Sequence, residues 1–244
     1  MTRKMKKTIL TLLMAATFTM PTMADDEMPD IRPTAYYTTA DGSEEESADY
    51  SGSAPLKGRF VANPTNADGW SATYEWRFSH EEDTEPYLVR YEEDTEYTFT
   101  RAGSHSIVLY ATFTRGEERV EFLEEYWSGA DALRVSVSES SLDMPNAFSP
   151  NDDGRNEEYR AKSYNSLIEF HATIFNRWGQ KLFEWDDPSK GWDGKHNGTP
   201  VKQGVYFVLV EAKGADGRRY RIKRDVNLIR GYTSSEGDSN GTGE

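Results

Sequence analysis

The chain has 244 residues, enough for two small domains, and 36% of them are hydrophobic and 13% aromatic, a balance that favours β-sheet over helix bundles. Its formal charge of −14 argues against nucleic acid and anionic membrane as partners. The lack of cysteine excludes disulfide scaffolds, zinc–thiolate sites, thiol nucleophiles and a cysteine-linked lipid anchor.

Residues 1–24 have the features of a cleavable signal peptide. Basic residues between Arg3 and Lys7 precede an apolar run at 9–18, and Pro21 and the residues up to Ala24 supply a helix break and a cleavage site. We expect cleavage after Ala24. The apolar run is too short to cross about 30 Å of hydrocarbon. No later segment could span a bilayer, so we expect no membrane span after cleavage.

Residues 25–143 are predicted to contain one β-sandwich at 54–143, preceded by a polar N-terminal segment at 25–53. Tyr36 and Tyr37 are expected in a first edge strand, whereas much of the rest of the polar segment is typical of linker or loop. Short alternating segments between turn signals predict seven strands, a number typical of a sandwich. The predicted strands are 56–62, 72–79, 87–91, 97–101, 106–113, 119–124 and 133–138.

Two of these segments indicate what fills the core of the first sandwich. Tyr74, Trp76 and Phe78 alternate along one strand and therefore face one side of it. A turn at Gly103 leads into the apolar run at 107–110. This pairing resembles PKD and related immunoglobulin-like modules of bacterial surface proteins, so the resemblance implies an immunoglobulin-like fold.

The composition changes at Pro145, where a proline is expected to end a sheet. Residues 25–143 carry 27 acidic and 9 basic residues, whereas 144–230 carry 12 acidic and 15 basic residues. An acidic module is therefore joined to a mildly basic one, and we place the second domain at 144–230.

Residues 144–230 are predicted to form a second antiparallel β-sandwich. Two apolar pairs, 174–175 and 182–183, flank a hairpin turn at 177–180, and Asn197-Gly198 is a strong hairpin signal. In the segment 201–210 both alternating faces are apolar, which predicts a central strand that is buried on both sides. The whole chain is therefore predicted to be all β, with two sandwiches in tandem.

Four blocks in this second module identify a family. They read PNAFSPNDDGRNEEY, TIFNRWGQKLFE, KGWDGKHNGTPVKQGVYFVLVEA and LIR. In this order they closely resemble the gliding motility-associated C-terminal domain of Bacteroidetes proteins, the type B sorting domain of the type IX secretion system. The resemblance implies export to the periplasm by a signal peptide, recognition by the outer-membrane translocon, and a passenger function upstream of the domain.

Residues 231–244 extend beyond the point where members of this family usually stop, near the LIR block. This run of glycine, serine and acidic residues is predicted to be a disordered tail. It could be passive, or it could impair sorting if the translocon requires a free end of the last strand.

One loop contains the residue types of a calcium site. Asn151, Asp153, Asn156 and Glu157 surround Gly154, and hard cations prefer several oxygen ligands on such a tight turn. The EF-hand pattern is incomplete, so a hydrogen-bonded Asx turn is the preferred interpretation of these residues. No other cofactor is expected.

The sequence contains no catalytic pattern, so the protein is predicted not to be an enzyme. The four histidines lack metal-ligand spacing, no nucleophile elbow is present, and the acidic pairs lie in polar turns. The histidines are His80, His105, His171 and His196.

Three tryptophans of the first domain could form a ligand platform. Trp76 is expected in the core, which leaves Trp70 and Trp127 as candidates to contact a surface glycan or protein ligand. The first functional hypothesis is a non-enzymatic, exported cell-surface or secreted protein whose C-terminal domain directs type IX secretion or surface attachment. The alternative is an adhesin or glycan-binding protein that uses these exposed aromatics.

Overall fold

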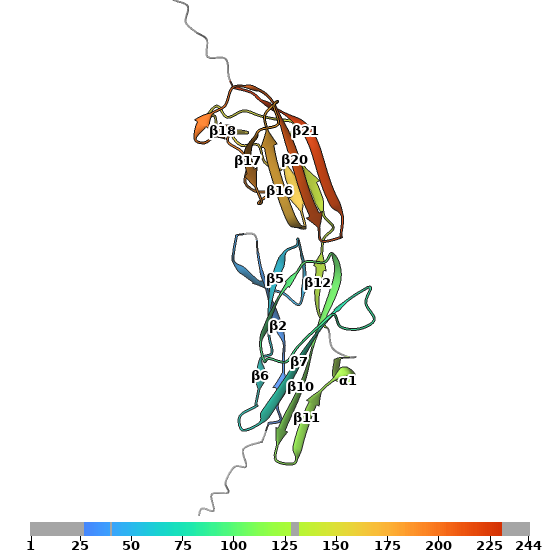
Figure 1. Ribbon diagram of the computed structural model, residues 1–244. Coiled ribbons are helices and arrows are strands. Elements are labelled where there is room, and N and C mark those ends of the chain that lie inside the picture. Colours follow the sequence, from blue (N-terminus) through green and yellow to red (C-terminus); the bar gives the residue numbers. More distant parts are fainter. Residues whose placement is uncertain (1–26, 40, 128–131, 231–244) are drawn as a thin grey trace, which may run out of the picture.

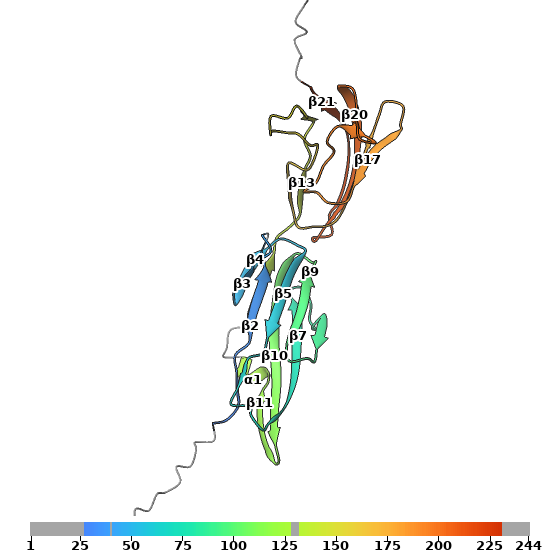
Figure 2. The ribbon, with the colours of Figure 1, turned by 90° about the vertical axis from the view of Figure 1, so that its left-hand side faces the viewer.

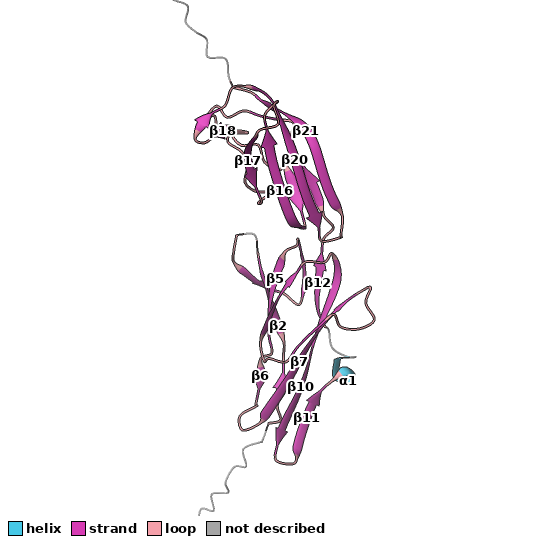
Figure 3. Cartoon of the chain, viewed as in Figure 1, coloured by secondary structure: helices cyan, strands magenta, loops and turns pink. Residues whose placement is uncertain are grey.

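The computed structural model describes residues 27–39, 41–127 and 132–230, and these form two β-rich units arranged end to end (Figure 1). Among these residues the only α-helix is α1 (Glu124–Trp127), so the all-β prediction is confirmed (Figure 3). No helix within the described ranges is long and apolar enough to cross a membrane. The predicted signal peptide at 1–24 and tail at 231–244 lie outside the described residues.

The first unit is a sandwich of two sheets, whose layers are visible in Figure 2. Its larger sheet consists, in order across the sheet, of β4 (Asp49–Gly52), β12 (Leu133–Val137), β10 (Gly103–Arg115), β7 (Ser71–His80) and β8 (Leu88–Arg90), with β11 (Glu118–Phe122) also paired to β10. Its smaller sheet consists of β3 (Glu44–Glu46), β2 (Thr34–Thr38), β5 (Leu56–Val61) and β9 (Thr95–Phe99). A short pair joins β1 (Asp30–Ile31) to β6 (Pro64–Thr65). The seven strands predicted between 56 and 138 are therefore confirmed.

Alternation along β7 and β10 fills the core of this sandwich, as predicted. Trp76 and Phe78 of β7 are fully buried, and Leu109 of β10 lies directly opposite Trp76 in the sheet. Phe60 of β5 crosses from the other sheet and meets Phe78 edge-on at 5.2 Å between ring centroids. The buried indole N–H of Trp76 donates to the backbone oxygen of Glu93 at 3.1 Å, so its polar atom is satisfied.

Residues 25–53 were predicted to be mostly linker or loop, and this prediction was wrong for the described residues. They form strands β1 to β4, and β2 buries Tyr37 completely in the first core, stacked on Tyr50 at 4.4 Å. The polar composition reflects an edge of the sheet: β3 is exposed throughout, and its Glu44 pairs at 2.6 Å with Arg59 of β5, which lies on the other side of β2. An exposed acidic edge strand has the composition of a loop, which is why the pattern misled.

The second unit has one large sheet and a narrower second layer. The sheet consists, in order, of β14 (Ala147–Phe148), β21 (Arg219–Leu228), β20 (Gly204–Gly214), β16 (Leu167–Phe175) and β17 (Lys181–Trp185). The other layer contains the pair β13 (Ser141–Asp143) and β15 (Ser163–Asn165), connecting loops, and the hairpin of β18 (Lys195–His196) and β19 (Thr199–Pro200). The second core lies between them (Figure 2). The hairpins predicted at 177–180 and Asn197-Gly198 are confirmed.

The strand β20 is central, as predicted, but it is buried on one face only. Tyr206, Val208 and Val210 face the second core, whereas Val205 and Phe207 on the opposite face are 49% and 42% exposed. The prediction of burial on both sides was wrong because none of the described residues forms a layer over the outer face of this sheet.

Hydrogen bonds and one buried residue connect the two units at their junction. The Ser166 hydroxyl accepts a hydrogen bond from the Ala54 N–H at 3.1 Å. Ala215, in the turn between β20 and β21, is buried against the core of the first unit, and its carbonyl accepts from the Ala102 N–H at 3.0 Å. The two units are therefore held by contacts that lie far apart in the sequence, in addition to the connecting chain.

Candidate functional site

Buried side chains from all four sequence blocks contribute to the second core. Trp192 is fully buried, its ring lies 5.4 Å from that of Phe148 and 5.1 Å from that of Tyr206, and its indole N–H donates to the backbone oxygen of Lys195 at 2.7 Å. Two backbone hydrogen bonds join Trp192 to Tyr159, which is also fully buried. These aromatic residues therefore stabilise the layer that consists of short strands and loops.

A single arginine connects three of the blocks. The Arg230 guanidinium donates to the backbone oxygens of Pro150 at 3.2 Å and Gly194 at 3.1 Å. Gly194 has a φ of +76°, and a Cβ there would lie 3.1 Å from Leu228 and Pro150, so glycine fits this crowded turn. Arg230, just after the last strand, is thus hydrogen-bonded to two loops of the opposite layer.

The turn between β16 and β17 presents a tryptophan to solvent. The Asn176 side-chain oxygen accepts the backbone N–H groups of Trp178 at 3.0 Å and Gln180 at 3.1 Å, which fixes the turn. Trp178 is nevertheless 77% exposed, with the guanidinium carbon of Arg177 4.6 Å from its ring centroid. Unlike Trp192, this residue of the blocks contributes nothing to the core.

Exposed apolar side chains gather near Trp178 on the outer face of the large sheet. Phe175 of β16 and Phe207 of β20 are directly opposite each other in the register, and Val205 precedes Phe207 on the same face. Phe175 is half-buried, and together with the exposed Ile229 just after β21 these five residues define an apolar patch. A shallow depression of about 350 Å³ lies between Phe175, Phe207 and the neighbouring strand β21. Monomeric proteins usually cover such patches, so it is a candidate contact surface.

The predicted calcium residues lie together in one exposed loop whose oxygens bind the loop itself. The Glu157 carboxylate accepts three backbone N–H bonds of 3.0 Å each, from residues 151, 152 and 154. Asn151 donates to Asp153 at 3.1 Å, and the backbone of Asn156 has a φ of +52°. Among the described residues no group of three or more His, Cys, Asp or Glu side chains is arranged to hold a metal. Calcium binding by Asn151, Asp153, Asn156 and Glu157 stays a prediction.

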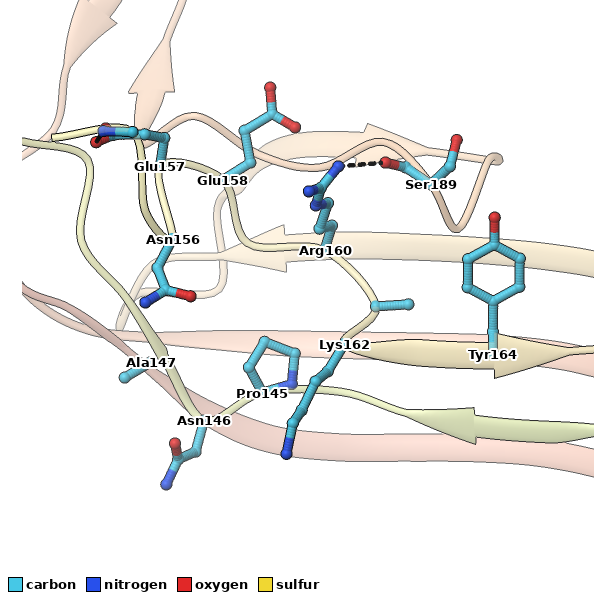
Figure 4. Close-up of a pocket in the computed structure, with 12 residues that line it drawn as sticks. Pro145, Asn146, Ala147, Asn156, Glu157, Glu158, Arg160, Lys162, Tyr164 and Ser189 are labelled. Carbon is cyan, nitrogen blue, oxygen red and sulfur yellow. Dashed lines mark hydrogen bonds between the residues drawn. The ribbon is translucent and has the colours of Figure 1, made fainter. Parts of the chain in front are cut away.

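A polar depression of about 850 Å³ lies beside this loop (Figure 4). Arg160 projects into it and donates to the backbone oxygen of Ser189 at 3.2 Å. Lys162 extends away from Glu158 and Arg160 (Figure 4). The charged groups that line the depression therefore do not converge on one point, as the acid and base of an active site would have to do.

Two histidines of the first unit are brought together by strand pairing. His80 of β7 and His105 of β10 are opposite each other, are both buried, and have ring centroids 4.8 Å apart. In each ring Nε2 contacts a backbone carbonyl at 2.9 Å, so Nε2 carries the proton and donates. Nδ1 is then the acceptor, from the Tyr87 hydroxyl at 3.0 Å for His105 and from a backbone N–H at 3.2 Å for His80. Burial lowers the pKa of His105, and both rings are satisfied in the neutral form.

The sequence did not reveal this pair, because its members are separated along the chain and only the register of β7 and β10 brings them into contact. The other two histidines lie in the second unit. His171 contacts Asp186 at 2.6 Å on the surface, and His196 contacts the backbone oxygen of Leu182 at 2.9 Å.

The two predicted ligand-binding tryptophans do not form an open platform in the described structure. Trp70 and Trp127 are both half-buried and pack against the first core. The guanidinium carbon of Arg115 lies 4.4 Å from the Trp70 ring centroid, and Trp127 meets Tyr126 edge-on at 5.0 Å. No ring contact joins the two tryptophans within the described residues. Glycan or protein-ligand binding by Trp70 and Trp127 stays a prediction.

Solved structures that align with this chain have low sequence identity to it. The fibronectin(III)-like modules of Clostridium thermocellum CbhA align over 83% of this chain and 95% of theirs, with 12% identity and a TM-score of 0.24. Latent PorU from Porphyromonas gingivalis aligns over 86% of this chain and 21% of its own, with 11% identity and a TM-score of 0.24. Neither likeness bears on function.

One curated relative and one family match the sequence. A human β-1,4-mannosyl-glycoprotein 4-β-N-acetylglucosaminyltransferase is 34% identical over 124 residues, which is 48% of this chain, and the chain spans 22% of that protein. Residues 142–224 match the model of the family described as CHU_C Type IX secretion signal domain. This confirms the identity predicted from the four blocks. Residues 142–224 are thus a type IX secretion signal domain of the CHU_C family, and the chain that carries them is exported to the cell surface or secreted.

Proposed function

We propose that this protein is a non-enzymatic surface protein whose second unit is recognised by the outer-membrane translocon of the type IX system. The single observation that carries the proposal is the match of residues 142–224 to the type IX secretion signal domain. The structure supports it because the matched residues fold around a core of their own. A folded unit with an exposed apolar patch can present a fixed surface to a partner.

The absence of enzymatic activity is supported by how the polar side chains are used. The ring nitrogens of His80 and His105 are occupied in the neutral form, and the Glu157 carboxylate is saturated by backbone N–H groups. The charges around the polar depression near Arg160 point in different directions (Figure 4). Within the described residues no acid, base and nucleophile therefore meet in a shared cleft.

The proposal is tested in a bacterium that has a type IX system. Removal of residues 144–244 should leave the protein in the periplasm. In the reciprocal test, residues 142–230 joined to a periplasmic reporter should bring the reporter to the cell surface. Surface display is measured by protease accessibility on intact cells. Display of the truncated chain at the level of the intact protein would refute the sorting role.

A matched variant separates recognition from folding. Trp192→Ala should unfold the second unit and block export, because the indole fills its core. Trp178→Ala should leave the fold intact, so a loss of display in this variant reports on a contact with the export machinery. Normal display of the Trp178→Ala protein would show that the exposed tryptophan is not part of the recognised surface.

A further inference from the structure

The strand β21 has a long free edge. On one side β20 pairs with it along its whole length, from Arg219 to Leu228. On the other side β14 pairs only with Asn227 and Leu228. The stretch from Arg219 to Val226 therefore has no strand beside it, and among the described residues no other strand has an unpaired stretch as long.

The hydrogen bonds at the end of β21 show which backbone groups face this free edge. The N–H of Asn227 donates to Asn146 on the β14 side at 2.9 Å, and that of Ile229 donates to Phe148 on the same side at 3.0 Å. Backbone groups alternate in direction along an antiparallel strand. The N–H and C=O groups of Arg219, Arg221, Lys223 and Asp225 therefore also point to the free side, where an incoming strand could pair with them.

The side chains along the edge specify what such a strand would contain. Arg219, Arg221 and Lys223 are exposed on the outer face, and Arg221 also contacts Glu211 of β20 at 3.2 Å. On the opposite face, Tyr220 and Ile222 are half-buried at the rim of the second core, and the Tyr220 hydroxyl is hydrogen-bonded to that of Ser140 at 2.8 Å. Arg224 follows them on this face and donates to the backbone oxygen of Met144, so the apolar part of the rim ends at Ile222. An added strand would place every second side chain beside the basic residues and the others over this apolar rim.

The edge has one usual protection against strand addition, its charged side chains, but the described strand lacks three others. Proteins protect exposed edges with charged residues, with proline, with bulges or by keeping the strand very short. The stretch from Arg219 to Val226 contains neither proline nor glycine and has no register shift against β20. On the opposite edge of the same sheet, the pairing of β16 with β17 is interrupted by a bulge at Ile174 and Phe175.

We propose that β21 is a strand acceptor, which binds an extended segment of another protein in which acidic and apolar residues alternate. The acidic residues pair with the column of Arg219, Arg221 and Lys223, and the apolar residues cover Tyr220 and Ile222. A second copy of this chain is disfavoured as the occupant, because two β21 edges would bring their basic columns together. This inference goes beyond export, since a partner bound here could be retained after secretion.

The test uses the full chain and a labelled peptide of about ten residues that alternates glutamate and valine, a length typical of a strand. Fluorescence anisotropy should show saturable binding that weakens as salt is raised. Two control peptides have the same length: one alternates lysine and valine, and the other has its glutamates and valines in two separate blocks. Neither control should bind, because one has the wrong charge and the other the wrong alternation.

Two variants at one position separate the backbone contribution from the charge. Lys223→Pro removes an N–H that faces the free edge, where proline is tolerated in a sheet, and should abolish peptide binding. Lys223→Ala keeps that N–H and should weaken binding only slightly. A triple variant, R219E with R221E and K223E, should weaken binding of the glutamate peptide by about tenfold or more and gain binding of the lysine peptide.

Hydrogen exchange locates the contact. On peptide binding, the amides of Arg221, Lys223 and Asp225 should become protected, and those of β14 should not change. No binding to the intact protein, or binding that Lys223→Pro leaves unchanged, would overturn the proposal. Sedimentation provides the last outcome: a dimer of the chain alone that Lys223→Pro dissociates would make a second copy the occupant and would likewise overturn it.

Discussion

The two units enclose their cores in different ways. In the first unit two sheets face each other, and alternation along β7 and β5 supplies buried residues such as Trp76 and Phe60 from both sides. In the second unit one sheet is covered on a single face, largely by loops that carry Tyr159 and Trp192. The outer face of that sheet and the free edge of β21 are left uncovered. The unit with the less regular core is therefore the one with surface available for partners.

The largest expected effect distinguishes the two cores directly. Trp76→Ala and Trp192→Ala each remove a fully buried indole and should each destabilise their own unit by about 3–5 kcal/mol. Calorimetry should show that each variant lowers the midpoint temperature of one unfolding transition only. If both variants lower the midpoints of both transitions equally, the two units unfold as one and their cores are not independent.

A smaller effect is expected where Arg230 joins the end of β21 to the loops. Arg230→Ala leaves the carbonyls of Pro150 and Gly194 without these donors and should cost the second unit about 1.5–3 kcal/mol. Arg219→Ala is the matched control, because loss of this exposed side chain should change the free energy of unfolding by no more than about 0.5 kcal/mol. Denaturant unfolding measures both, and equal losses would show that the contacts of Arg230 do not stabilise the loops.

Acid should destabilise the first unit through His105. Burial lowers the pKa of this ring below its usual value of 6.5, so below that pH the unfolded chain binds more protons than the folded one. The free energy of unfolding should therefore fall as the pH falls below about 6.5. The groups around the ring are His80, Tyr87, Arg101 and Glu81, and the last two carry opposite charges.

His105→Gln should reduce this pH dependence of the first unit, as measured by the midpoint of thermal unfolding between neutral and mildly acidic pH. His171→Gln is the control in the second unit, because its ring is exposed. A slope that His105→Gln leaves unchanged would assign the acid sensitivity to other groups.

The smallest expected effect on stability concerns the exposed Trp178. Trp178→Ala should change the free energy of unfolding by no more than about 0.5 kcal/mol, because the ring is outside the core. The loss of unfolding free energy in Trp178→Ala is to be compared with that in Trp192→Ala. Although both tryptophans belong to the four sequence blocks, the two losses should differ several-fold. A large loss in the Trp178 variant would mean that the turn itself depends on the contact with Arg177.

Much of this architecture could be read from the sequence, because alternation and turn residues act locally. The spacing of Tyr74, Trp76 and Phe78 predicted one face of β7, and Asn197-Gly198 predicted its hairpin. Tyr37 shows the limit: its burial depends on Tyr50 and Phe60, which reach it from other strands, while the surrounding glutamates resemble those of a loop.

The candidate sites could be predicted less well, for a related reason. The contact of His80 with His105 follows from strand register, and the free edge of β21 follows from β14 ending after two pairs. The exposure of Phe207 depends on the absence of a covering layer, since a strand with two apolar faces has the same sequence whether one or both are buried. Only Trp178, between Asn176 and Gly179 in a turn, carried a local signal, because large aromatic residues are unusual at turn tips.

The junction at Ser166 and Ala215 has a mechanical consequence. Ala215 lies in the turn that connects β20 to β21, the same strand that carries the free edge, and it is seated in the first core. A pull on a partner strand added to β21 would therefore reach the first unit through this turn as well as through the covalent chain. Such a force would have to break the contacts of Ala215 and Ser166 before the two units could separate.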